Sequence, residues 1–370
     1  MIYSTKKKLQ LLFKKTSYWF FKIFYGKIKF YENSKDNTDC NILTSQIDTQ
    51  FKYSVYFTNN ARLYTDTVNN CAIINNQKIL SGPSYQIIDT KFETIEKNIV
   101  LSIGTPRIKK KLNGKVLSLL TGGAGNHNYW HWLFDVLPRL NIVSNIKRLK
   151  DFDFYLFPNL GKNFQKETID ALGIPLEKCI SSLKYRHIEC EQLVNTDHPY
   201  VINNNATYEI QNLPLWIIKW LKKNLTKGID LKDSQYPKKI FIDRKDASPN
   251  VSKRRKIINE EEVKYFLSNN GYKIINLSDY HFNDQMKFFY NAQKITGLHG
   301  AGFSNVLFCD KKTQVLELKP SEAGKIFENL AKKCEIMYEC ITVVPEKYNE
   351  KNQMGNININ IDELKKKIDD

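Results

Sequence analysis

The chemically richest stretch of the sequence is GNHNYWHWLFDVLPRL, at residues 125–140. His127, His131 and Asp135 are spaced four residues apart, so they share one face of a helix. This pattern supports binding of a divalent cation, or acid/base catalysis by His131 or Asp135 among apolar neighbours that perturb the pKa. A metal site needs further ligands, and no paired glutamate of the HExxH kind lies nearby. Arg139 follows Asp135 by four residues, so a helix-face ion pair is a third interpretation.

A second candidate group surrounds the turn ITGLHGAGFSN at residues 295–305. Gly300, Ala301 and Gly302 lie where an expected strand runs straight into a helix, and backbone N–H groups at such a helix start bind anions. His299 precedes them, where it is expected to contact a phosphate. A tight turn with a packed histidine is the alternative, and the GK[ST] ending of a P-loop is missing.

Charged residues also follow the neighbouring expected strands. Arg244 comes directly after the strand IFID, and Arg255 lies in a basic run before the next helix. Arginine holds a diphosphate through paired hydrogen bonds. Glu317 lies at the carboxyl end of the expected strand TQVLEL, before a proline, and we expect it to accept hydrogen bonds from ribose hydroxyls; a surface acid is the alternative.

Alternating strands and helices must position these residues. KVLSLL, DFDFYLF and CEQLVNT are expected strands in the first half, and Pro138 is expected to kink or divide the helix that carries His131. In the second half, KKIFID, YKIINL, KITGL and TQVLEL alternate with helical patterns, the first of them capped by Asn259. This alternation predicts a parallel, doubly wound α/β sheet, and ligands of such sheets bind beyond the carboxyl ends of the strands.

Composition divides the 370 residues into five parts. We expect a basic segment over 1–30, a first α/β domain over 31–225, a polar linker over 226–237, a second domain over 238–345 and a polar tail or helix over 346–370. Seven scattered cysteines, none spaced CxxC, indicate reduced thiols in a cytoplasmic protein.

The net charge of +17 is partly a feature of the N-terminus, because residues 1–30 contain eight lysines and no acid. Its apolar residues follow helical spacing, with the lysines mostly off that face: Leu9, Leu12, Phe13, Thr16, Trp19, Phe20 and Ile23. The stretch is too short and lysine-interrupted to span a bilayer. We expect a peripheral helix on anionic lipid at the inner face of the plasma membrane, with a solvated or partner-packed helix as the alternative.

Several blocks in order resemble one family. NYWHWLFDVLPRL at 128–140 resembles the NYxHWLxDxLPRL signature of glycosyltransferase family 61, which includes bacterial capsule and lipopolysaccharide enzymes. Arg244 after IFID and Arg255 in an R-x3-N-E block are similar to further blocks of the family. HGAGFSNVLF at 299–308 and VLEL at 315–318 complete the resemblance.

The resemblance implies an α/β fold of GT-B type, with two Rossmann-like domains facing across a cleft. It implies transfer from a nucleotide-sugar donor to a hydroxyl of a growing surface polysaccharide or lipid-linked glycan, with inversion and without a metal or other cofactor. The two arginines and the glycine turn would then stabilise the leaving diphosphate. Asp135 is the first candidate for the base and His131 the second.

Two further sets of residues complete this hypothesis. The expected donor-binding residues are Arg244, Arg255, His299, Gly300, Ala301, Gly302, Asn305 and Glu317. The expected acceptor-side residues are Asn128, Tyr129, Trp132 and Arg139. Nucleic acid is not an expected partner. The rival functions are a metal-dependent hydrolase that uses His127, His131 and Asp135, and a non-catalytic basic binding protein.

Overall fold

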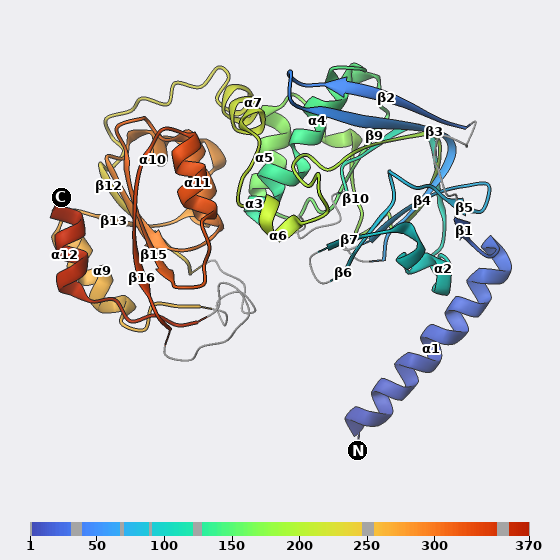
Figure 1. The fold of residues 1–370 in the computed structure, drawn as a ribbon, viewed down its shortest axis with the longest axis horizontal. Helices are drawn as coiled ribbons and strands as arrows, with labels where there is room; N and C mark the ends of the chain where they lie inside the picture. The colour runs from blue at the N-terminus through green and yellow to red at the C-terminus, as the bar shows by residue number, and fades with distance from the viewer. Residues whose placement is uncertain are drawn as a thin grey trace. The chain divides into compact units, whose positions relative to one another are not determined.

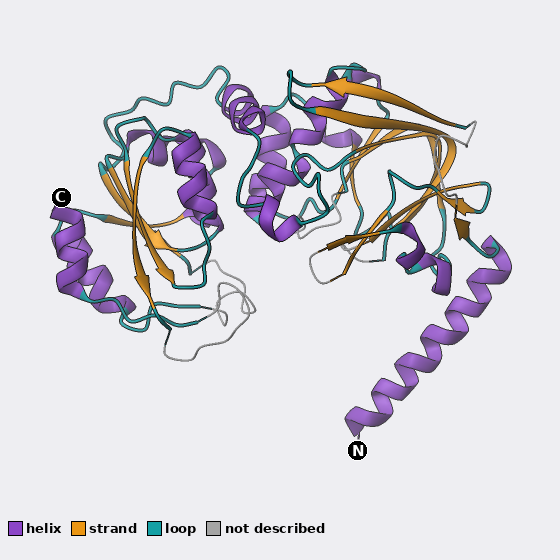
Figure 2. Cartoon of the chain, viewed as in Figure 1, coloured by secondary structure: helices purple, strands orange, loops and turns teal. Residues whose placement is uncertain are grey.

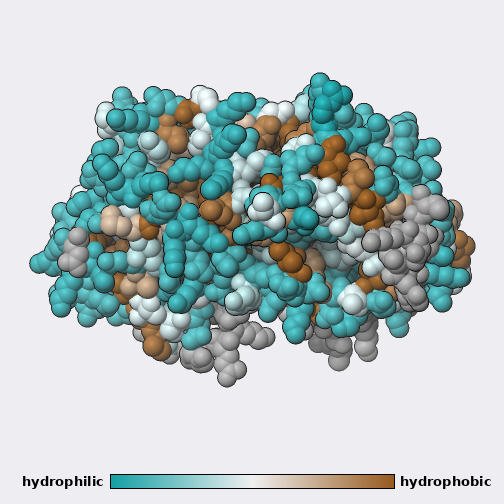
Figure 3. Space-filling view, turned by 45° about the horizontal axis from the view of Figure 1, so that its top comes forward, coloured by the Kyte–Doolittle hydropathy of each residue, from teal (hydrophilic) through white to brown (hydrophobic). Residues whose placement is uncertain are grey.

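The computed structural model describes residues 2–30, 39–66, 70–88, 91–120, 128–245, 255–345 and 355–369. The chain forms two compact units, Met1–Glu209 and Ile210–Asp370 (Figure 1). Both combine strands and helices (Figure 2), which confirms the α/β class. The surface seen in Figure 3 is mostly hydrophilic, with hydrophobic side chains in scattered small patches.

The first unit is built on a mixed sheet. Among its described residues the strands are β1 (Lys29–Phe30), β2 (Cys40–Gln46), β3 (Lys52–Tyr64), β4 (Asn70–Asn75), β5 (Lys78–Ile79), β6 (Tyr85–Ile88), β7 (Lys91–Glu93), β8 (Lys110–Ser118), β9 (Phe154–Phe157), β10 (Cys179–Ser181) and β11 (His187–Thr196). The main path runs β1-β5-β4-β3-β11-β8-β9-β10. The end from β11 to β10 is parallel, whereas β2, β4 and β11 pair with β3 in antiparallel fashion. Only the parallel end therefore has the strand arrangement expected of a Rossmann-like domain.

The first unit also contains helices, one of which comes before the first strand. They are α1 (Ile2–Tyr25), α2 (Val100–Ile103), α3 (Tyr129–His131), α4 (Pro138–Ser144), α5 (Asn163–Ala171) and α6 (Ala206–Glu209). Within the described part of the chain, no helix combines the length and apolarity that a bilayer crossing requires.

The second unit has a five-stranded sheet in which every neighbouring pair is parallel, so the prediction of a parallel sheet is confirmed. Its strands are β12 (Lys239–Asp243), β13 (Lys273–Asn276), β14 (Lys294–Leu298), β15 (Gln314–Pro320) and β16 (Met337–Val343), in the order β13-β12-β14-β15-β16. The central strands are apolar and almost wholly buried, as strands covered on both faces must be.

Helices cover both faces of this sheet. In Figure 1, α9 (Glu260–Asn269) and α12 (Ile361–Asp369) lie on one side, and α10 (Phe282–Asn291) and α11 (Ile326–Lys333) lie on the other. The C-terminal segment was expected to be a polar tail or helix. Its described part contains the helix α12, whose Leu364 and Ile368 are buried in the core of the unit. This helix is therefore a structural part of the second unit.

The division between the units differs from the expected boundary. α7 (Leu215–Leu225), expected in the first domain, belongs to the second unit, where Lys222 Nζ donates to the carbonyl oxygen of Cys309 at 3.0 Å. The expected linker at 226–237 also packs on this unit, because Asn291 Nδ2 donates to the carbonyl oxygen of Leu231 at 2.7 Å. Polar composition alone did not reveal these tertiary contacts.

Asn259 likewise has a tertiary role. Its side chain makes no capping bond to α9. Instead Nδ2 donates to the carbonyl oxygen of Ile359 and Oδ1 accepts from the N–H of Ile359, both at 2.9 Å. This paired contact fastens the segment before α12 to the start of α9.

Candidate active site

The helix that carries His131 and Asp135 is built in three pieces. A π-helical turn, η3 (Trp132–Val136), lies between α3 and α4, and the N–H of Leu137 bonds to the carbonyl oxygen of Trp132 at 3.2 Å. Pro138 has no N–H and its ring would clash with the carbonyl four residues earlier, so the preceding turn widens. Pro138 was expected to kink or divide the helix, and in the structure it begins α4 directly after the widened turn. Asp135 lies within the widened turn.

Asp135 is a buried carboxylate that binds three side chains. Its Oδ2 lies 2.7 Å from Nδ1 of His131 and 3.8 Å from Nε2 of His198, and its Oδ1 accepts a hydrogen bond from the hydroxyl of Tyr200 at 2.8 Å. The side chain of His131 is 20% exposed, whereas that of Asp135 is 2% exposed. His131 is therefore the accessible member of the pair.

The hydrogen bonds of His198 show which ring nitrogen carries its proton. Its Nδ1 accepts backbone N–H groups of Tyr200 at 3.3 Å and Val201 at 3.1 Å. A ring nitrogen that accepts carries no proton, so the proton of neutral His198 is on Nε2 and faces Asp135. Burial lowers the pKa of His198 more than Asp135 raises it, which keeps the ring neutral.

Opposite effects act on the His131–Asp135 pair. Burial by itself raises the pKa of Asp135, but the charge and hydrogen bond of His131, with those of His198, lower it well below its usual value. Burial lowers the pKa of His131, but the carboxylate of Asp135 outweighs it and the pKa is raised. Asp135 thus stays ionised and fixes the orientation of a ring whose pKa it raises.

Sequence reasoning missed His198 and Tyr200. Both follow β11 in the stretch TDHPY, at the carboxyl end of a strand that pairs in parallel with β8. That position is where ligands of parallel sheets bind, so the available signal was a histidine and a tyrosine directly after an expected strand. Phe92 of β7 also reaches this cluster, with its ring centroid 5.4 Å from that of His198.

Two expected acceptor-side residues lie in the core. Trp132 is fully buried and its indole N–H donates to the hydroxyl of Thr168 at 2.8 Å. Arg139 is buried and donates to the carbonyl oxygen of Thr196 at 3.0 Å, in place of the helix-face ion pair with Asp135. Both side chains are therefore buried supports of the helix that carries His131 and Asp135.

The other two lie nearer the surface. Asn128 is exposed, and its Oδ1 caps α3 by accepting the N–H of Trp130 at 2.9 Å. Tyr129 is half-buried and packs edge-on against the ring of Phe164. These are the acceptor-side candidates that a substrate can reach.

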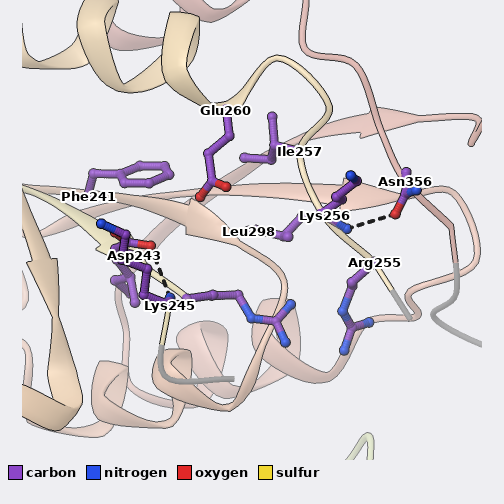
Figure 4. A pocket seen from close by; sticks show the side chains of 11 residues that line it. Phe241, Asp243, Lys245, Arg255, Lys256, Ile257, Glu260, Leu298 and Asn356 are labelled. Atoms are coloured by element: carbon purple, nitrogen blue, oxygen red, sulfur yellow. Dashed lines mark hydrogen bonds between the residues drawn. The ribbon is translucent and has the colours of Figure 1, made fainter. Parts of the chain in front are cut away.

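In the second unit, a cavity of about 430 Å³ opens at the carboxyl ends of β12 and β14 (Figure 4). The chain passes from β12 to β13 on one side and returns to β14 on the other, so the strand order reverses at this point. Ligands of doubly wound sheets bind at such a reversal. The lining residues are Phe241, Ile242, Asp243, Arg244, Lys245, Arg255, Lys256, Ile257, Glu260, Leu298 and Asn356.

The cavity favours anions. Its cationic lining residues are Arg244, Lys245, Arg255 and Lys256. Two carboxylates, Asp243 and Glu260, also line it, but Lys264 Nζ lies 3.1 Å from an oxygen of each. The carboxylates are thus paired, and the balance of charge that faces a ligand is positive. A polyanion such as a diphosphate fits this balance.

The glycine turn holds one of these arginines in place. Arg244 Nη1 donates to the carbonyl oxygen of His299 at 2.9 Å, and a Cβ on Gly300 would lie 3.0 Å from Arg244 Nε. Gly302 lies against the side chains of Ile242 and Leu277. The structure therefore brings the turn and Arg244 together, as expected. From Ala301 the chain enters a 3₁₀ helix, η7 (Ala301–Phe308).

His299 and Glu317 form a buried cluster behind the turn. Nδ1 of His299 bonds to Oε1 of Glu317, whose Oε2 accepts from the hydroxyl of Tyr338. Burial lowers the pKa of His299 more than Glu317 raises it. Asn305 is also buried and donates to Gln285 Oε1 at 3.3 Å. Through these contacts His299, Glu317 and Asn305 support the turn. Contacts between these three residues and a nucleotide remain a prediction.

The rival metal site depends on a residue that the structure does not cover. His127 lies outside the described residues. In the part of the chain that is described, no group of three or more His, Cys, Asp or Glu side chains is arranged to hold a metal ion. Nδ1 of His131 and Oδ2 of Asp135 are instead bonded to each other.

The family model described as Glycosyltransferase 61 matches residues 129–316, about half of the chain. The chain belongs to this family. The match begins at α3, includes the His131–Asp135 pair and the cavity beside β12, and ends in β15 of this glycosyltransferase. Members of a glycosyltransferase family use, in general, a nucleotide-sugar donor and a glycan acceptor. No curated protein matches the chain.

Proposed function

We propose that this glycosyltransferase moves a sugar from a nucleotide-sugar to a hydroxyl of a growing surface polysaccharide or lipid-linked glycan, in a capsule or lipopolysaccharide pathway. The observation that carries the donor assignment is the cavity at the β12–β14 reversal, with its four cationic lining residues. The phosphate groups of a sugar nucleotide bind there, and the sugar is transferred with inversion. No metal or other cofactor is required in this proposal, because the arginines and lysines neutralise the leaving phosphate.

His131 is the proposed base, and Asp135 orients it. Asp135 occupies Nδ1 of His131, so the proton of the neutral ring lies on Nδ1 and the lone pair lies on Nε2. The acceptor hydroxyl loses its proton to Nε2 as its oxygen bonds to the anomeric carbon. The bond from that carbon to the phosphate oxygen breaks in the same step, and its electron pair leaves with the nucleotide.

This assignment reverses the order in which the sequence ranked the two candidates. The support comes from exposure, because Asp135 is sealed from solvent while His131 is accessible. The carboxylate also stabilises the imidazolium as it forms, which is the established role of an acid behind a catalytic histidine.

Tyr200 and His198 are proposed as positioning residues. Tyr200 donates to Oδ1 of Asp135, and His198 directs its Nε2 proton at Oδ2, the oxygen that also bonds to His131. Together they keep the carboxylate in one rotamer, so that the lone pair of His131 points in one direction.

The cellular setting follows from the same proposal. We propose a GT-B arrangement for the two units. The His131–Asp135 pair then lies on the acceptor side, and the cavity of the second unit lies on the donor side. Donors of this kind are cytoplasmic, so we place the enzyme in the cytoplasm at the inner face of the plasma membrane.

Donor binding and metal use can be tested on the purified full chain. We expect one or a few members of a panel of UDP-, GDP- and CMP-sugars to raise the melting temperature, because a ligand that binds only the folded state stabilises it. Transfer with that donor is expected to persist in EDTA. Loss of transfer on chelation, restored by a divalent cation, would overturn the metal-free mechanism, and a panel without any stabilising member would overturn the donor assignment.

A further inference from the structure

Helix α1 exposes a continuous apolar face. Seven large apolar side chains on it are each 50–74% exposed: Leu9, Leu12, Phe13, Trp19, Phe20, Ile23 and Phe24. They recur at the three- and four-residue spacing that gathers side chains on one face of a helix. Thr16 interrupts this face, but its hydroxyl donates to the carbonyl oxygen of Leu12 at 2.6 Å, so only its methyl group is left to face outward. The exposed face is therefore apolar along its length.

The C-terminal end of the same helix is fixed to the first unit. Tyr25 accepts the backbone N–H of Lys109 at 3.0 Å, and its ring packs edge-on against His187 with the centroids 4.9 Å apart. Phe21 stacks on Tyr25, and Ile28, just after the helix, is buried in a core cluster of this unit. The helix is thus held to the unit that carries His131 at its C-terminal end, through Tyr25 and the buried Ile28.

The charge beside the apolar face is positive. Residues 1–30 contain eight lysines and no acid, and Lys15 and Lys22 are exposed along one edge of this face, seven residues apart. We propose that the apolar face of α1 is a docking surface for an anionic lipid bilayer, on which the helix lies parallel to the membrane plane. The aromatic and aliphatic side chains enter the headgroup boundary, and the lysines bind the lipid phosphates.

This surface extends the proposed function without depending on it. A helix anchored through Tyr25 holds the base-carrying unit at the membrane in one orientation, which suits an acceptor that is itself attached to a lipid. Docking is measured by vesicle binding alone, so a failure of docking and a failure of sugar transfer are told apart.

The test is co-sedimentation of the full chain with vesicles. One set contains phosphatidylcholine alone and the other equal parts of phosphatidylcholine and phosphatidylglycerol. We expect strong binding to the anionic vesicles, weakened by salt, and at least about tenfold weaker binding for the double variant Phe13→Ser, Phe20→Ser. The matched control is Tyr208→Ser, Tyr265→Ser, which removes two aromatic rings exposed elsewhere and is expected to bind like the wild type.

A second readout follows the helix directly. Trp19 is 66% exposed, so its fluorescence should shift to shorter wavelength when anionic vesicles are added, and a Trp19→Phe variant should lack that change. The melting temperature should not change in the double variant, since both rings face solvent. Wild-type protein that stays in the supernatant with anionic vesicles would overturn the proposal. So would equal binding by the double variant, or a dimer in solution that dissociates on Phe13→Ser, Phe20→Ser and ignores vesicles.

Discussion

Replacing Asp135 by asparagine isolates the electrostatic role of the carboxylate. His198 directs its Nε2 proton at Oδ2, so an asparagine should keep its oxygen on the side of His198 and His131. Its amide group then faces Tyr200, whose hydroxyl can accept as well as donate. The Nδ1–H tautomer of His131 is therefore retained. The substitution removes the negative charge of the side chain but keeps its size and its hydrogen bonds.

The size of the effect follows from the geometry. An imidazolium and a carboxylate whose charges lie about 4 Å apart attract by about 4 kcal/mol at the effective dielectric constant of a protein site. Complete proton transfer in the transition state would lose all of this energy, and half transfer would lose about 2 kcal/mol. The expected fall in kcat/KM is therefore between about 30-fold and about 1000-fold. Burial would then act unopposed on His131, so its pKa should fall and the acidic limb of the pH profile should move to lower pH.

The assay is kcat/KM for transfer as a function of pH, with donor affinity measured separately. Donor affinity should not change, because the cavity belongs to the second unit. Asp151→Asn is the control, since this carboxylate belongs to the same unit and forms an ion pair with Arg148 at the surface. An Asp135→Asn enzyme with wild-type kcat/KM, or with an acidic limb at higher pH, would refute the assignment of His131 as base.

Three further outcomes are expected. Gly300→Ala places a Cβ 3.0 Å from Arg244 Nε, so it should displace the guanidinium and raise the donor Kd about tenfold, as measured by calorimetry. Burial lowers the pKa of His187 to about 4, so between pH 7 and pH 4 this histidine is protonated in the unfolded chain but mostly neutral in the folded protein. About 3 kcal/mol of stability should therefore be lost over this range. Urea unfolding of His187→Gln should lack this loss. Tyr200→Phe removes a buried hydrogen bond to the ionised Asp135, so it should cost about 1.5–3 kcal/mol in urea unfolding and move the acidic limb of kcat/KM to higher pH.

Each of these three variants has a control variant. A Cβ on Gly302 meets only the side chains of two apolar residues, so Gly302→Ala should cost about 1–3 kcal/mol of stability and raise the donor Kd less than Gly300→Ala does. Tyr155→Phe removes a hydroxyl that bonds to a backbone carbonyl and should not move the pH profile. His281→Gln removes an exposed histidine and should not alter the loss of stability at low pH. A donor Kd raised equally by both glycine variants, or equal pH dependence in wild type and His187→Gln, would contradict the reasoning.

Local sequence patterns predicted the elements of the second unit well. The strands at β12, β13, β14 and β15 were expected from apolar runs, and in β12, β14 and β15 these runs reflect burial on both faces. The boundary of the unit was not predictable in this way. α7 and the polar stretch after it are fastened by contacts with residues such as Cys309 and Asn291, which lie some 60 to 90 positions later in the chain.

The candidate site shows the same limit. Sequence by itself determined that His131 and Asp135 are neighbours, because the four-residue spacing on a helix fixes their separation, and that Arg244 and the HGAG turn lie at the carboxyl ends of strands. Which of His131 and Asp135 is buried was decided only by tertiary structure, when the loop after β11 brought His198 and Tyr200 onto the carboxylate. Burial and hydrogen bonding depend on the segments that cover a residue, and those segments come from distant parts of the chain.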